Sequence, residues 1–218
     1  STCWRQPYWK HYPLFARTIA RLCWLLSRGH HVCDVAIVYP TSTVQAGLTL
    51  NGPTDTARRA QDAWTELTGS MVWQRFQPGL LDQWNRDYDA LDEDSLARAE
   101  VRDGKVIIGA ESFSTLILPA LTHLPEDAVQ RLKDFAAAGG QLIALHAAPD
   151  ALVAQAVVVQ QATEIEALLK TRPARVESSV PLLHRRVDDL NIVLVTACRG
   201  MATTVHPPPR EWWARRSY

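Results

Sequence analysis

The chain has 218 residues, of which 47% are hydrophobic, and its 23 Lys and Arg residues balance its 23 Asp and Glu residues to a net charge of zero. That balance excludes an electrostatic nucleic-acid binder, which would carry a basic stripe. No apolar run approaches the roughly 20 residues that a membrane-spanning helix needs, so we predict neither a nucleic-acid nor a membrane partner.

The first part of the chain predicts an aromatic opening, two helices and a buried strand. Residues 4–12 carry four aromatic side chains, and residues 14–29 place apolar side chains at helical spacing. Residues 35–39 form a short apolar run stopped by a proline, which is typical of a buried strand. The next segments are predicted as a loop over residues 41–54 and an amphipathic helix over residues 55–76.

The middle of the chain repeats the alternation of strand and helix. Asp103-Gly104, between extended flanks, is a strong signal for a hairpin. The segment 124–140 has a proline and acids at its start, an apolar stripe and two glycines at its end, which together predict a helix. The remaining predictions are a strand at 87–90, a helix capped by Asp92 or Asp94, and buried strands at 114–121 and 141–146.

This order of elements indicates a parallel sheet covered by helices on both faces. Beyond Pro149 the pattern weakens. A helix is predicted from Ala162 to Lys170, and a hairpin is predicted around Asp188-Asp189. The chain begins without methionine, and we expect it to start within a longer protein.

Candidate functional residues follow from the rule that open α/β sheets bind ligands beyond the carboxyl ends of their strands. The rule selects Tyr39, the segment from Asp87 to Asp89, Leu118-Pro119 and His146. Two carboxylates and a histidine facing one crevice could perform acid–base chemistry. The alternative is a carboxylate that caps a helix and a histidine that bonds to neighbouring backbone.

The nucleophile that His146 would need is absent from the sequence. An amidotransferase-like enzyme would place Cys or Ser on a tight turn after a strand, in a G-x-C-x-G or G-x-S-x-G motif, and neither motif occurs. Ser112 and Ser114 precede their strand. We therefore predict no catalytic residue in this chain. An enzyme that uses Asp89 and His146 with a metal or water is a weaker alternative, since two ligands are too few for a closed metal site.

No cofactor or metal site is predicted. The sequence lacks GxGxxG, Walker A and HExxH motifs, and no two cysteines have CxxC spacing. His30-His31 is a lone pair before a strand with no third ligand at a useful spacing. Cys23 and Cys33 are expected to be buried free thiols, because unpaired cysteine buries readily.

The order of four segments resembles a junction in large bacterial glycoside hydrolases of the alpha-L-rhamnosidase type. These segments are QPYWKHYPLFARTIARLCWLLSRGHHVCDVAIVYP, DYDALDEDSLARAEVRDGKVIIGAESFSTLILPAL, LPEDAVQRLKDFAAAGGQLIAL and LLHRRVDDLNIVLVTA. In that family the last helix of the catalytic barrel runs into an amidotransferase-like domain. The resemblance covers most of residues 4–148 and, more loosely, 181–197.

The resemblance implies an α/β, flavodoxin-like (class I glutamine amidotransferase-like) three-layer sandwich with a mostly parallel sheet. Residues 1–30 would be an aromatic segment and helix from the end of the barrel, and residues 31–150 the amidotransferase-like domain. Residues 151–218 would form a C-terminal helix, a β-hairpin and an irregular tail.

The family's catalytic carboxylates precede the matching region, so the resemblance implies a non-catalytic accessory domain or fragment, inactive alone, of an enzyme that acts on alpha-L-rhamnosides. It would pack against the barrel, contact carbohydrate through the parent enzyme, and be extracellular or periplasmic. Trp9 would lie near the barrel mouth, where it could stack on sugar or pack between domains. The predicted substrate-binding residues are Asp89, His146, Tyr39 and Trp9. The alternative is a stand-alone carbohydrate-binding or scaffolding module of flavodoxin-like fold.

Overall fold

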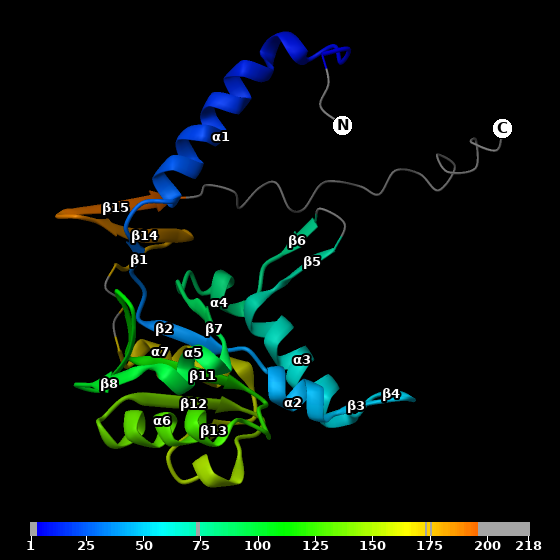
Figure 1. Ribbon diagram of the computed structural model, residues 1–218, viewed down its shortest axis with the longest axis vertical. Helices are drawn as coiled ribbons and strands as arrows, with labels where there is room; N and C mark the ends of the chain where they lie inside the picture. Colours follow the sequence, from blue (N-terminus) through cyan, green and yellow to red (C-terminus); the bar gives the residue numbers. More distant parts are fainter. Residues whose placement is uncertain (1–3, 73–74, 173, 175, 196–218) are drawn as a thin grey trace.

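The computed structural model describes residues 4–72, 75–172, 174 and 176–195. Its centre is a five-stranded, fully parallel sheet flanked by helices (Figure 1). The predicted parallel α/β sheet is confirmed. The sheet has the spatial order β13-β12-β11-β2-β7, in which the strands are β2 (Val35–Val38), β7 (Asp89–Leu91), β11 (Thr115–Pro119), β12 (Gln141–Leu145) and β13 (Val157–Val159).

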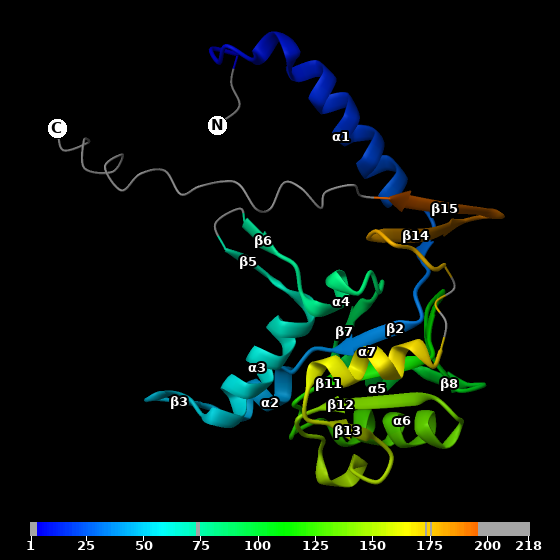
Figure 2. The same cartoon turned by 180° about the vertical axis from the view of Figure 1, so that it is seen from behind.

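The central strands are apolar along their whole length because helices cover both faces of the sheet. Within β2, Ala36 and Val38 belong to one hydrophobic cluster, whereas Val35 and Ile37 belong to the other. The first cluster is completed by α5 (Glu93–Arg98) and α6 (Glu126–Ala137). The second is completed by α3 (Asp55–Thr68) and α7 (Ala162–Lys170). Figures 1 and 2 show these two pairs of helices on opposite sides of the sheet.

The helix boundaries follow local capping chemistry. Asp92 is the N-cap of α5 and accepts a hydrogen bond from the Ser95 amide (2.8 Å), which settles the choice between Asp92 and Asp94. The two glycines after α6 serve different purposes. Gly139 adopts a left-handed conformation (φ 89°), whereas a Cβ at Gly140 would come within 2.2 Å of the Phe135 ring. Gly140 therefore leaves room for the largest fully buried side chain of the core.

Two sequence predictions between residues 41 and 79 are wrong in detail. The predicted loop contains a short helix, α2 (Thr41–Ala46), and a hairpin of β3 (Leu48–Thr49) and β4 (Gly52–Pro53). The predicted helix over 55–76 ends at Thr68, because Gly69 turns the backbone to φ 82°. A hairpin of β5 (Ser70–Val72) and β6 (Arg75–Gln77) follows, and the short helix α4 (Leu80–Gln83) comes after it.

The hairpin at Asp103-Gly104 is confirmed. Both turn residues have positive φ (53° and 69°), as a type I′ turn requires. The turn joins two strands of an antiparallel three-stranded sheet, which consists of β8 (Glu100–Arg102), β9 (Lys105–Ile108) and β10 (Glu111–Phe113).

The α/β layers continue past the expected domain boundary at residue 150. After a 3₁₀ turn (Asp150–Leu152), β13 pairs with β12 and α7 buries Ile165 and Leu169 against the sheet. The helix from Ala162 to Lys170 is confirmed. The hairpin around Asp188-Asp189 is also confirmed, as β14 (Leu182–Val187) and β15 (Leu190–Val195). It forms a separate sheet with β1 (His30–His31).

The N-terminal helix stands apart from the sheet (Figures 1 and 2). A 3₁₀ turn (Trp9–His11) leads into α1 (Tyr12–Leu26), and α1 buries none of its residues against the described part of the chain. Cys23, which was expected to be buried, is exposed on this helix. Among the described residues, no helix is long and apolar enough to cross a membrane.

Candidate functional site

The carboxyl edge of the sheet carries three of the predicted positions: Tyr39 after β2, Leu118-Pro119 at the end of β11 and His146 after β12. Tyr39 is 42% exposed and meets Trp64 edge to face, with ring centroids 4.8 Å apart. The His146 amide donates to the Val159 carbonyl (2.8 Å), and its own carbonyl accepts from Gln160 (3.3 Å). The hydrogen bonds of His146 within the described residues are therefore made by its backbone, to residues at and after β13.

The backbone at this edge is nevertheless strained at two neighbouring strand ends. Ala120 follows β11 with φ 52°, and His146 follows β12 with φ 67°. Non-glycine residues rarely adopt this left-handed conformation, which carries a cost of about 1–2 kcal/mol. Active-site turns of hydrolases store strain in the same way beneath a nucleophile. At these two positions the side chains are the methyl group of Ala120 and the imidazole of His146.

Other polar side chains at the carboxyl edge hold loops together. The buried Thr43 hydroxyl donates to the His123 carbonyl (3.0 Å) and accepts from the amides of Thr122 (3.1 Å) and His123 (3.0 Å). The buried Glu93 carboxylate accepts from the Ser42 amide (3.0 Å) and from the Ser42 hydroxyl. These bonds tie α2 to the loop after β11 and to the start of α5, and this accounts for the burial of both groups.

Asp89 does not share this edge, and the prediction that it faces one crevice with His146 is wrong. It is the first residue of β7 and pairs with Ala36 near the start of β2, whereas β7 ends at Leu91. Asp89 therefore lies at the amino edge, at the opposite end of the strands from His146. Trp9 lies on neither edge: it stacks on Tyr12 at the start of α1, with ring centroids 5.1 Å apart. Sugar binding by Asp89, His146, Tyr39 or Trp9 stays a prediction.

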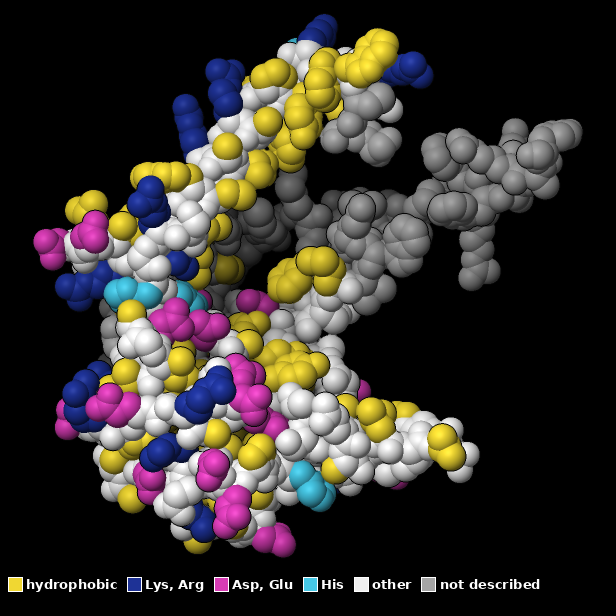
Figure 3. Space-filling model, viewed as in Figure 1, with side chains coloured by type: hydrophobic (Ala, Val, Ile, Leu, Met, Phe, Trp, Pro, Cys, Tyr) yellow, Lys and Arg dark blue, Asp and Glu magenta, His cyan; other side chains and the backbone are white. Residues whose placement is uncertain are grey.

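The amino edge instead carries a cluster of four chemically active side chains: His31, Cys33, Asp87 and Asp89. His31 Nε2 lies 2.8 Å from Asp87 Oδ2, and His31 Nδ1 lies 3.1 Å from Asp89 Oδ2. Cys33 Sγ lies 3.7 Å from the same Nδ1. Two strands that neighbour each other in the sheet bring the four together, since His31 and Cys33 precede β2 while Asp87 and Asp89 lie at the start of β7. In the space-filling view, histidine and acidic side chains lie side by side below the β14–β15 hairpin (Figure 3).

The two carboxylates determine the protonation of this cluster. Burial by itself would lower the pKa of His31, but its hydrogen bonds to Asp87 and Asp89 outweigh burial and raise the pKa to about 12. The hydrogen bond from His31 lowers the pKa of Asp89, against the opposing effect of burial. Burial raises the pKa of the Cys33 thiol. Without a bound ion, the cluster is therefore an imidazolium held between two carboxylates beside a neutral thiol.

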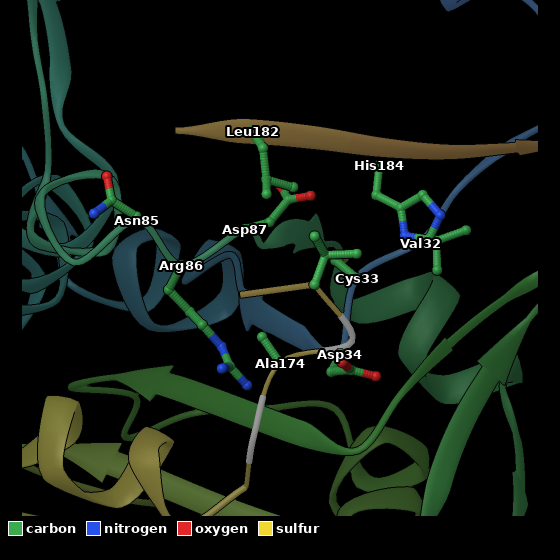
Figure 4. Close-up of a pocket in the computed structure, with 10 residues that line it drawn as sticks. Val32, Cys33, Asp34, Asn85, Arg86, Asp87, Ala174, Leu182 and His184 are labelled. Carbon is green, nitrogen blue, oxygen red and sulfur yellow. The ribbon is translucent and has the colours of Figure 1, made fainter. Parts of the chain in front are cut away.

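A small cavity adjoins the cluster (Figure 4). Its volume of about 20 Å³ gives room for a single water molecule. The lining includes Cys33, Asp87, Arg86 and, from β14, the nearly buried His184. His184 Nε2 lies 3.0 Å from Asn191 Oδ1, whereas the buried Nδ1 has no hydrogen-bond partner among the described residues. A buried ring nitrogen without a partner is costly, which favours an occupied cavity.

The sequence contains a local signal for this cluster. His31-x-Cys33 and Asp87-x-Asp89 are both i, i+2 pairs, and in an extended segment such pairs project to the same side. Each pair was interpreted alone: the histidines as a pair without a third ligand, and Cys33 as a buried free thiol. The burial of Cys33 is confirmed. What the sequence does not reveal is that the segment before β7 lies beside the segment before β2.

Comparison of the chain with protein-family models, with curated proteins and with solved structures finds no match.

Proposed function

We propose that the chain is a non-catalytic accessory domain of flavodoxin-like (class I glutamine amidotransferase-like) fold, belonging to a glycoside hydrolase that acts on alpha-L-rhamnosides. The fold assignment is supported by the strand order. Numbered along the chain, the five parallel strands run 2-1-3-4-5 across the sheet, which is the flavodoxin-like order. The hydrolase assignment rests on the order of the four sequence segments.

The observation that carries the non-catalytic assignment is the chemistry of the carboxyl edge. In open α/β sheets this edge is where ligands and reactive groups gather. Here the strained turn after β11 presents Ala120, and the buried Thr43 and Glu93 side chains are engaged in bonds between loops. Among the described residues, the two strained turns carry no cysteine or serine, which are the nucleophiles that such turns present in amidotransferases and hydrolases.

The N-terminal helix supports a role as part of a larger protein. Exposed large apolar side chains run along α1 and the turn before it, including Trp9, Phe15, Ile19 and Trp24. Large exposed apolar side chains gathered along one helix are typical of a segment that a partner covers. In our proposal the partner is the catalytic barrel of the parent enzyme, which also supplies the carbohydrate contact near Trp9 and the extracellular or periplasmic location.

The test is a hydrolysis assay of the purified chain with aryl alpha-L-rhamnosides. We expect no turnover above the buffer rate for the wild-type chain, because in our proposal the catalytic carboxylates belong to the barrel of the parent enzyme. The variants His146→Ala and Asp89→Asn should likewise show no turnover above the buffer rate. Turnover by the wild-type chain that either substitution abolishes would contradict the proposal.

A further inference from the structure

We propose that His31, Cys33 and Asp89 form a binding site for a divalent transition-metal cation of the zinc class. Their ligand atoms, Nδ1, Sγ and a carboxylate oxygen, all lie within 4.8 Å of one another. Imidazole, thiolate and carboxylate are the three side-chain ligands that zinc takes in proteins. Magnesium and calcium prefer oxygen ligands alone, so the cysteine selects against them.

The two separations that involve His31 Nδ1 are close to those of tetrahedral coordination. With zinc–sulfur bonds of about 2.3 Å and zinc–nitrogen bonds of about 2.0–2.1 Å, ligand sulfur and nitrogen atoms stand roughly 3.6 Å apart, and nitrogen and oxygen roughly 3.3 Å apart. Cys33 Sγ lies 3.7 Å from His31 Nδ1, and Asp89 Oδ2 lies 3.1 Å from it. The Asp89 side chain is 35% exposed, which leaves it free to adjust to an ion.

The surrounding hydrogen bonds orient the ligands. Asp87 Oδ2 lies 2.8 Å from His31 Nε2, so that Nε2 can donate to it and leave the Nδ1 lone pair facing Cys33 and Asp89. A carboxylate behind a metal-bound histidine is a recurring arrangement, because it fixes the tautomer and strengthens the ligand. The Ala90 amide donates to Asp89 Oδ1 (2.9 Å) and leaves Oδ2 for the ion.

The cavity beside Cys33 can hold the fourth ligand. It has room for one water molecule, and the His184 ring projects from β14 toward the segment with Val32 and Cys33 (Figure 4). Because His184 Nε2 donates to Asn191 Oδ1, the unpartnered Nδ1 is an acceptor for a water held in the cavity. The unpartnered nitrogen is an observation independent of the three ligands, and it points to an occupant of the cavity that Cys33 lines.

Binding would place a cation between groups that already lie together. His31 lies between the carboxylates of Asp87 and Asp89, and both would be attracted to a divalent ion held at Nδ1. Metal ligands bind in their deprotonated form, so the imidazole would bind as a neutral group and the cysteine as a thiolate, and their protons would pass to solvent. The site joins the segments before β2 and before β7, so metal binding should stabilise the fold.

The test uses the full chain, stripped with a chelator and titrated with Zn²⁺ and, separately, with Co²⁺. We expect one equivalent of zinc to bind and raise the melting temperature. Bound cobalt should show a near-ultraviolet thiolate-to-metal charge-transfer band. Cys33→Ser should abolish that band, and Asp89→Asn should lower zinc affinity by at least about 10-fold.

The matched controls change the chain's other cysteines and the neighbouring histidine. The triple variant Cys3→Ser, Cys23→Ser, Cys198→Ser and the variant His30→Gln should bind both metals as the wild type does. Circular dichroism of each variant verifies that it folds. Absence of the cobalt band in the wild-type chain, or its persistence in Cys33→Ser, would overturn the proposal. So would loss of the band in the triple variant.

Discussion

Replacing Phe135 by alanine is expected to lower the free energy of unfolding by about 3–5 kcal/mol. Phe135 lies on α6, is fully buried, and packs its ring against Gly140 and the cluster between α5, α6 and the sheet. Removing the ring leaves a cavity that the rigid strands cannot close. Urea denaturation followed by circular dichroism measures the change.

The matched control is Phe15→Ala on α1, where the same side chain is 58% exposed. Because α1 buries no residue against the described chain, this substitution should change stability by less than about 0.5 kcal/mol. A large loss of unfolding free energy in Phe15→Ala, or a loss below about 1 kcal/mol in Phe135→Ala, would contradict the assignment of Phe135 to the core and of Phe15 to the surface.

The variant His31→Leu, measured in the presence of a chelator, is expected to cost about 2 kcal/mol of stability. Leucine cannot neutralise Asp87 and Asp89, so two partly buried carboxylates are left without their shared partner. Removing one member of a fully buried ion pair costs about 3–5 kcal/mol. The side chains of Asp87 and Asp89 are 22% and 35% exposed, and water screening therefore reduces the cost.

The triple variant His31→Leu, Asp87→Asn, Asp89→Asn separates this explanation from a simple loss of packing. Removing the two charges together with the imidazole should recover part of the stability lost in His31→Leu, since neutral amides tolerate the site better than unpaired carboxylates. If the triple variant is less stable than His31→Leu, the unpaired charges of Asp87 and Asp89 are not the cause of the stability lost in His31→Leu.

The local patterns predicted most of the parallel sheet. Uninterrupted apolar runs predicted β2, β11 and β12, and the residues at its two ends predicted α6, because each of these signals depends on a few neighbouring residues. The predicted helix over residues 55–76 was too long, because its true end depends on a contact between two glycines that are ten residues apart in the sequence. Gly69 and Gly79 pack backbone to backbone, and a Cβ at Gly79 would come within 2.3 Å of the Gly69 amide nitrogen. Neither the end of α3 nor the hairpin after it follows from helical periodicity.

The candidate site was harder to predict than the fold, because it depends on register. A strand placed at residues 87–90 puts Asp89 near its carboxyl end, whereas the observed strand, Asp89–Leu91, puts the same residue at the amino edge. Asp87 and Asp89 meet His31 only because β7 lies next to β2 in the sheet, and sequence patterns do not give that neighbour relation.

Titration calorimetry of the purified chain with L-rhamnose and aryl alpha-L-rhamnosides tests the central claim most directly. We expect no heat of binding, since we propose that the sugar contacts are made by the catalytic barrel of a parent enzyme. Heat that disappears in Tyr39→Ala or His146→Ala would contradict the account, because it would show that this edge is a working carbohydrate site.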